Sequence, residues 1–120
     1  MTQFTGIRVL VVEDEGFVAL MIEDMLDELG CEVVASVADI GAACEAASRV
    51  NADIAMLDVN LAGQLVFPAA EILRQRQIPV LFSTGYASTS LPAAFVGNQV
   101  LNKPFSQAEL QQKLLLALGR

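Results

Sequence analysis

The chain contains no histidine and no tryptophan, only two cysteines, and half as many basic residues as acidic ones. Cys31 and Cys44 have no CxxC spacing and no histidine partners, so the sequence argues against a zinc centre and both are interpreted as small core residues. Seven basic against fourteen acidic residues give a net charge of −7. This balance argues against direct nucleic-acid binding through a basic patch.

Long apolar segments and targeting signals are also missing. No apolar run approaches the roughly 20 residues that a membrane-spanning helix needs. The first residues, Met1 to Phe4, lack the basic start and long apolar region of a signal peptide. We expect a soluble, cytoplasmic protein with no membrane partner.

The composition indicates one compact domain over residues 1–120. A hydrophobic fraction of 54% with only 18% charged residues argues against disorder, and the length suffices to bury a core without metal or disulfide. Eight of the fourteen acidic residues lie between Glu13 and Glu32, where no basic residue occurs. Most of these acids are expected on a solvated helix face. Glu13 and Asp14 are interpreted differently, because they follow a predicted strand.

Strand and helix patterns alternate five times, which predicts a doubly wound α/β fold with a parallel sheet. The predicted strands are 7–12, 32–36, 53–58, 79–83 and 99–102. The predicted helices are 16–29, a helix that Asp39 caps and that runs to Val50, Pro68 to about Gln77, a short or irregular helix within 87–97, and a last helix that Ser106 caps. Residues 60–65 are expected to form a loop that contains Gly63.

Local signals predict helix ends and faces. Glu109 completes a capping box with Ser106, and Gly30 is typical of the residue that ends a helix. The apolar spacing of the first helix predicts buried positions at Val18, Met21, Ile22, Met25 and Leu29, with Phe17 and Leu20 at an exposed rim.

Polar and charged residues directly follow or end four of the predicted strands. Glu13 and Asp14 follow the first strand, and Asp58 ends the third. Thr84 lies at the end of the fourth strand, and Lys103 follows the fifth. Ligands of open α/β sheets bind at the carboxyl ends of such strands. We therefore predict that three carboxylates, a hydroxyl and an amine meet in a site for a divalent cation and a phosphoryl group.

Asp58 is the predicted nucleophile of this site, since a carboxylate can attack phosphorus and form an acyl phosphate. A cation must then offset the negative charge, and Mg²⁺ prefers oxygen ligands. Glu13, Asp14 and Asp58 would supply carboxylates, together with a backbone carbonyl just after Asp58. The Lys103 ammonium and the Thr84 hydroxyl would contact the phosphoryl oxygens.

These motifs resemble the receiver domain of two-component response regulators over essentially the whole chain. The residues that carry the resemblance are Glu13-Asp14, Asp58, Thr84-Gly85 and Lys103-Pro104-Phe105. The resemblance implies a flavodoxin-like five-stranded parallel sheet with strand order 2-1-3-4-5 and five helices, the fourth short or irregular. It implies that Asp58 is the phosphoacceptor. It also implies that Asp14, Asp58 and the Asn60 backbone bind Mg²⁺, with Glu13 acting mainly through water.

Two features depart from the usual family pattern. Val100 stands three residues before the lysine, where the family usually has a Tyr or Phe that switches rotamer together with the threonine. The segment Phe82 to Tyr86, which includes Gly85, resembles the Phe-Ala-Thr-Gly-x-Tyr signature of stand-alone receivers associated with alphaproteobacterial stress signalling. Two interpretations of Tyr86 stay open: it covers the sheet edge, or it limits water access to the phosphoryl site.

The resemblance also implies partners and an output. A histidine kinase or a histidine phosphotransfer protein would donate the phosphoryl group and meet the first helix. The signal would pass through contacts with a downstream protein, so the chain is interpreted as a phosphoacceptor rather than an enzyme. We expect a monomer or a weak dimer, since three successive leucines of the last helix, 114–116, do not all face inward.

Three alternatives remain. A haloacid dehalogenase-type phosphatase also phosphorylates a strand-end aspartate but needs Asp-x-Asp, whereas Asp58-Val59-Asn60 offers an amide. A flavin carrier needs a hydroxyl-rich loop after the first strand, where Glu13 to Glu15 would repel a phosphate. A pseudo-receiver would bind partners without phosphorylation despite its intact acceptor set.

Overall fold

A computed structural model describes residues 4–85 and 91–120 of the chain. Its main sheet contains five parallel strands in the order β2-β1-β3-β6-β7. The strands are β1 (Arg8–Val12), β2 (Glu32–Val37), β3 (Ile54–Asp58), β6 (Val80–Thr84) and β7 (Val100–Asn102). Numbered as five strands in chain order, this is the predicted order 2-1-3-4-5, and the flavodoxin-like prediction is confirmed.

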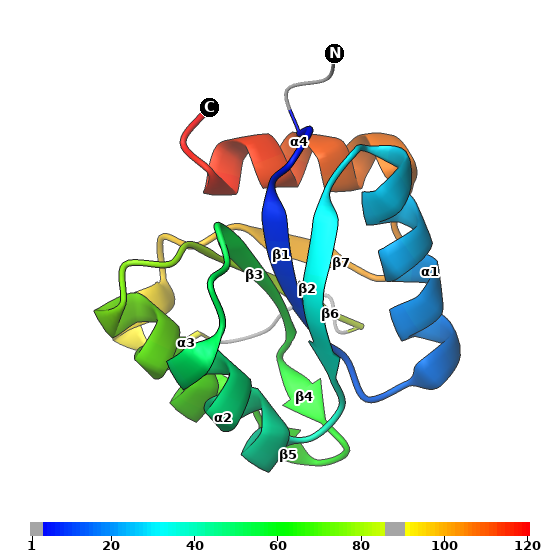
Figure 1. Cartoon of the computed structure of the whole chain (residues 1–120). Helices are drawn as coiled ribbons and strands as arrows, with labels where there is room; N and C mark the ends of the chain where they lie inside the picture. Colours follow the sequence, from blue (N-terminus) through cyan, green and yellow to red (C-terminus); the bar gives the residue numbers. More distant parts are fainter. Residues whose placement is uncertain (1–3, 86–90) are drawn as a thin grey trace.

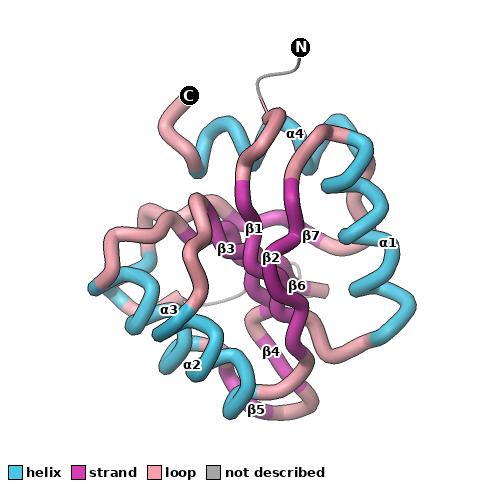
Figure 2. Tube along the Cα trace, in the orientation of Figure 1, coloured by secondary structure: helices cyan, strands magenta, loops and turns pink. Residues whose placement is uncertain are grey.

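Helices cover both faces of the sheet, as Figures 1 and 2 show. The α-helices in the described residues are α1 (Gly16–Glu28), α2 (Ile40–Arg49), α3 (Phe67–Gln75) and α4 (Gln107–Ala117). The five strands and the first three α-helices begin and end within two residues of their predicted bounds, and α4 begins directly after its predicted cap, Ser106. The doubly wound arrangement leaves the carboxyl ends of the strands open at one edge, since the helices occupy the faces.

Alternate side chains of the strands build two separate cores. Val9 and Val11 pack with Ile22 of α1 and Leu110 of α4. The residues between them face the other layer, where alanines of α2 and α3 bring those helices close to the sheet; this set includes Leu10, Val12, Ala43, Ala47, Ala69 and Ala70. β3 is buried along its whole length. Burial of a central strand on both faces explains why its sequence is a continuous apolar run up to Asp58.

The predicted caps are present. The Asp39 side chain accepts a hydrogen bond from the backbone N–H of Ala42 at 2.8 Å, which begins α2. Gly30 follows α1 with a φ of +92°, a conformation that favours glycine. Ser106 and Glu109 form the reciprocal capping box that begins α4.

Three local predictions need correction or refinement. Residues 60–65 form a small antiparallel hairpin of β4 (Asn60–Leu61) and β5 (Gln64–Leu65) rather than a plain loop. Met21 is 41% exposed and Leu26 is buried instead, so the buried stripe of α1 consists of Ile22, Leu26 and Leu29 at i, i+4 and i+7. The irregular fourth helix is a single 3₁₀ turn, Ala93–Phe95, within the described part of 87–97.

Three of the exposed apolar residues lie on helices where the sequence predicted exposed apolar positions. Phe17 is 92% exposed and Leu20 is 59% exposed on α1. On α4, Leu110 and Leu114 are buried while Leu116 is 49% exposed. In the described residues, no helix is both long and apolar enough to cross a membrane.

The α4 cap gives a direct test of the fold. We expect Ser106→Ala to lower the free energy of unfolding by about 1 kcal/mol, because the N–H of Glu109 loses its acceptor. Urea unfolding followed by far-UV circular dichroism measures the change. Ser106→Asp keeps an acceptor oxygen and should stay within about 0.3 kcal/mol of the unchanged protein. Equal losses for both variants would contradict the capping role.

Candidate functional site

The carboxyl ends of β1, β3, β6 and β7 bring Asp14, Asp58, Thr84 and Lys103 to one cleft of about 470 Å³, and Glu13 is buried in contact with Lys103. Glu13 and Asp14 follow β1, Asp58 ends β3, and Thr84 ends β6. The residues that line the cleft are Asp14, Glu15, Asp58, Asn60, Ala62, Gly63, Thr84, Gly85 and Lys103. The sheet order therefore places β1, β3 and β6 side by side at the cleft, with β7 next to them.

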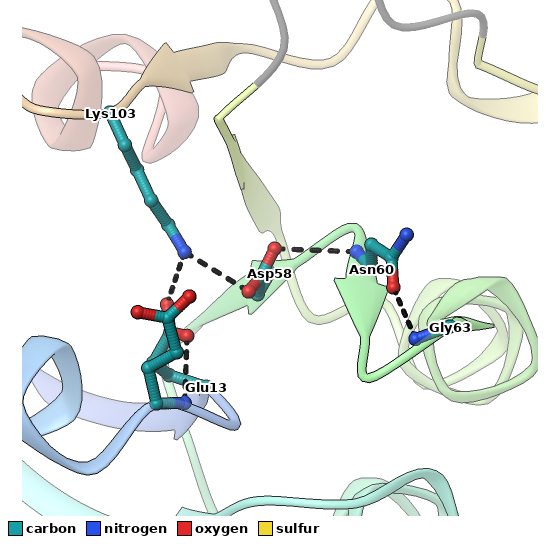
Figure 3. A network of polar contacts seen from close by, with 6 residues as sticks. Glu13, Asp58, Asn60, Gly63 and Lys103 are labelled. Carbon is teal, nitrogen blue, oxygen red and sulfur yellow. Dashed lines mark hydrogen bonds and ion pairs between the residues drawn. The ribbon is translucent and has the colours of Figure 1, made fainter.

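Lys103 joins two of the carboxylates, as Figure 3 shows. Its Nζ lies 2.6 Å from Glu13 Oε1 and 3.0 Å from Asp58 Oδ2. The side chain of Lys103 is 18% exposed, and both carboxylates are almost completely buried. Burial lowers the pKa of Lys103, but the hydrogen bonds to Glu13 and Asp58 outweigh burial and leave its pKa above the ordinary value. Lys103 therefore remains a cation in contact with both acids.

The carboxylates of the site carry more negative charge than this ammonium offsets. Glu13, Asp14 and Asp58 each place a carboxylate oxygen within 4.8 Å of the others. Burial raises the pKa of Asp58 to about 6; the hydrogen bond from Lys103 opposes this rise and the charge of Glu13 adds to it. Clustered carboxylate oxygens open to a cleft form the donor set that Mg²⁺ prefers. The residues present thus fit a hard divalent cation.

The side chains of Asp58 and Asn60 each accept a hydrogen bond from a backbone N–H that follows them in the chain. Asp58 Oδ1 accepts a hydrogen bond from Asn60 N at 3.3 Å, and Asn60 Oδ1 accepts one from Gly63 N at 2.6 Å. Figure 3 shows both contacts. The Asn60 amide is engaged in the hairpin, and an amide supplies no acid or base. The site therefore lacks the second catalytic carboxylate that the haloacid dehalogenase alternative requires at this position.

Thr84 is buried at the cleft, and its backbone carbonyl accepts a hydrogen bond from Lys103 N at 2.8 Å. This backbone contact joins the strand ends that carry the predicted hydroxyl and the predicted amine. Gly85 is exposed and lines the cleft beside Thr84. Tyr86 lies outside the described residues, so both interpretations of its role stay predictions.

Val100 lies on β7 opposite Phe82 and is partly buried against the core of the α2 and α3 layer. That core contains an aromatic cluster that the sequence did not predict. Phe82 contacts Phe67 edge-on at 5.7 Å between ring centroids and Phe95 at 5.5 Å, and Phe67 and Phe95 stack at 6.1 Å. The spacing of the phenylalanines in the sequence does not predict this cluster, because Phe95 meets the other two rings only where the 3₁₀ turn places it against the sheet.

Two other features of the cleft were not predicted. Glu15 lines it, and its backbone N–H donates to Glu13 Oε2 at 3.1 Å. Ala62 and Gly63, at the tip of the hairpin, form part of its wall. Gly63 was noted in the sequence as a loop residue, but a hairpin two residues long on each strand has too little alternation to be predicted.

Comparison with known proteins gives a consistent result. The sequence model of one protein family, the response regulator receiver domain, matches residues 9–115. The solution structure of SdrG from Sphingomonas melonis Fr1 is 36% identical, with a TM-score of 0.83 over 100% of both chains. The receiver domain of the sensor histidine kinase PA1611 from Pseudomonas aeruginosa, with a magnesium ion coordinated in its active site cleft, is 32% identical. Its TM-score is 0.82 over 97% of this chain and 100% of that chain.

Among curated proteins, the transcriptional regulatory protein PdtaR of Mycobacterium tuberculosis is 32% identical over 117 residues. That match covers 94% of this chain and 57% of PdtaR. The chain thus spans little more than half the length of this relative.

The charge balance of the cleft predicts the effect of removing the Lys103 ammonium on stability. We expect Lys103→Met to lower the free energy of unfolding in EDTA by about 2 kcal/mol, less than for a fully buried pair because the ammonium is partly exposed. Added MgCl₂ should recover part of this loss by replacing the positive charge. Chemical denaturation with and without metal measures both effects.

Lys113→Met is the matched control, since Lys113 is the chain's only other lysine and contacts the neutral Gln99 at 3.3 Å. This control should change the free energy of unfolding by less than about 0.5 kcal/mol. Losses of the same size in the two lysine variants would show that Lys103 does not balance the carboxylates.

Proposed function

The chain belongs to the response regulator receiver family of two-component signalling, and we propose that Asp58 accepts a phosphoryl group from a phosphohistidine in a reaction that depends on Mg²⁺. One observation carries this proposal. The carboxylate of Asp58 ends the central strand, lies 3.0 Å from the Lys103 ammonium, and belongs to a cluster of three acids at an open cleft. A nucleophile, a charge-balancing amine and metal-ligating oxygens are thus within reach of one phosphorus atom.

The proposed reaction is a displacement at phosphorus. A carboxylate oxygen of Asp58 forms the new O–P bond while the P–N bond to the donor imidazole breaks, and the imidazole nitrogen keeps the electron pair. Lys103 then contacts a phosphoryl oxygen in place of part of its contact with Asp58. The hydroxyl of Thr84 donates a hydrogen bond to another phosphoryl oxygen.

Asp14, Asp58 and the backbone carbonyl of Asn60 would hold Mg²⁺, with Glu13 acting mainly through water. When bound, Mg²⁺ offsets the negative charge of the carboxylates and of the phosphoryl oxygens. The raised pKa of Asp58 supports this assignment, because burial among like charges leaves its carboxylate short of positive charge. The magnesium ion described for the PA1611 receiver domain supports it as well.

We propose a signalling role rather than turnover of a substrate. The phosphoryl donor would be a histidine kinase or a histidine phosphotransfer protein, and phosphorylated Asp58 would change contacts with a downstream protein. Membership of the receiver family supports both proposed partners. Phosphorylation adds about −1.5 to −2 charges at one point, enough to redirect the single ammonium that contacts Asp58.

An apolar surface beside the cleft supports docking of the donor on α1. A groove of about 270 Å³ continues from the cleft and shares Glu15 and Lys103 with it. Met21 and Phe105 line this groove, and the exposed Phe17 lies two residues after Glu15. Apolar contact area of this kind next to the phosphoryl site suits a helical donor that carries its histidine into the cleft.

Phosphorylation by a small donor tests the proposed function. We expect incubation with acetyl phosphate and MgCl₂ to add one phosphoryl group to the intact mass, because the site contains its own nucleophile and metal ligands. Asp58→Asn should show no gain, and EDTA should abolish the gain in the unchanged protein. A mass gain that survives Asp58→Asn, or none with metal present, would refute the proposal.

The docking surface has a separate test. We expect Phe17→Ala to slow phosphotransfer from an autophosphorylated histidine kinase by about tenfold, since an interface aromatic would be lost. The donor would be the fastest kinase of a purified panel, and transfer is measured by loss of labelled kinase. Labelling by acetyl phosphate should be unchanged, because Phe17 does not line the cleft.

Leu116→Ala is the control for this test, as it removes an exposed leucine from α4. It should leave kinase transfer unchanged. Equal transfer rates for the Phe17 and Leu116 variants would exclude α1 as the docking surface.

A further inference from the structure

The hairpin after Asp58 has an unfavourable turn at the wall of the cleft. Register pairs Asn60 with Leu65 and Leu61 with Gln64, so Ala62 and Gly63 are the two loop residues. Their φ angles are +52° and +92°. Positive φ at both central positions is typical of the type I′ turn, in which Asn-Gly or Gly-Gly is preferred. Ala62 is therefore held in a conformation that alanine disfavours.

A hydrogen bond to Asn60, which lies outside the turn, offsets the unfavourable conformation of Ala62. Asn60 Oδ1 accepts the hydrogen bond of Gly63 N at 2.6 Å, and this contact closes the hairpin across its tip. The same residue donates its backbone N–H to Asp58 Oδ1 at 3.3 Å. Figure 3 shows how these two contacts connect the turn through Asn60 to the carboxylate that contacts Lys103. A change at Gly63 thus reaches Asp58 through one residue.

We propose that Asn60 is a positioning residue: its side chain pins the turn at Gly63 and so holds its own backbone, and through it Asp58, in place for metal binding and phosphorylation. This inference rests on the proposed function. With Oδ1 of Asp58 held by Asn60 N, Oδ2 is directed to Lys103. The carbonyl of Asn60, the proposed metal ligand, belongs to the same pinned segment. The Asn60 amide acts through the backbone and does not contact the phosphoryl group.

Three variants distinguish this positioning role from a direct action of the Asn60 amide at the site. Asn60→Ala removes the pin. Asn60→Ala combined with Ala62→Gly removes the pin but also relieves the turn, without adding a side chain to the cleft. Asn98→Ala is the matched control, because Asn98 also binds backbone with its side chain, donating to the Val80 carbonyl at 2.9 Å. Asn98 does not line the cleft.

Two measurements are made on each variant. The Kd for Mg²⁺ comes from amide chemical shifts in an NMR titration, and the phosphorylation rate at saturating acetyl phosphate and Mg²⁺ comes from intact mass. We expect Asn60→Ala to raise the Kd and lower the rate by about tenfold each, as loss of a residue supporting metal ligands does. The double variant should recover about threefold in both, since glycine adopts positive φ without strain. Asn98→Ala should match the unchanged protein.

Two results would overturn the inference. If Asn60→Ala behaves like Asn98→Ala, the pin has no effect on the site. If Asn60→Ala is impaired and Ala62→Gly recovers nothing, the amide acts directly rather than through the turn. Failure of the unchanged protein to be phosphorylated would refute the proposed function alone, because the Kd values for Mg²⁺ still decide whether Asn60 positions the ligands.

Discussion

The contact of one ammonium with two buried carboxylates is the constraint on which the cleft depends. Lys103 lies 90 residues from Glu13 and 45 residues from Asp58 in sequence, yet its Nζ contacts both. This contact requires β1, β3 and β7 to run in the same direction and to end at the same edge. A parallel sheet provides that arrangement, because its crossover helices return every strand to the same starting side. The two apolar cores therefore serve to hold unfavourable charges together.

Those charges explain why the site is suited to gaining a cation and a phosphoryl group. The pKa of Asp58 lies near 6 because burial and Glu13 together outweigh the attraction of Lys103. Buried like charges are unfavourable in the folded state, and the stability of the sheet offsets them. Binding of a divalent cation would reduce the repulsion between these carboxylates. The unfavourable charge of the site without a cation would thus contribute to its affinity for the proposed cation.

Sequence reasoning succeeded where a residue type reports directly on its environment. Apolar runs located the five strands, and their ends located Glu13, Asp58, Thr84 and Lys103, because burial on both faces leaves little freedom of composition. It failed for the hairpin, since the bond from Asn60 to Gly63 is a local contact without a periodic signal. It also failed for Met21, which is exposed while Leu26 is buried in its place, and for the rings around Phe82, which meet only in the folded chain.

The short length of β7 has a consequence for how a change at the site would reach the rest of the domain. This edge strand has three residues, pairs on one side only, and carries Val100 where no ring is available to rotate. Lys103 follows it directly, and its backbone is tied to Thr84. We therefore expect a displacement of the lysine head group to move this short edge strand more readily than β3, which is paired on both sides. The edge strand β7 is thus the place where we expect the proposed phosphorylation signal to leave the sheet without a moving aromatic side chain.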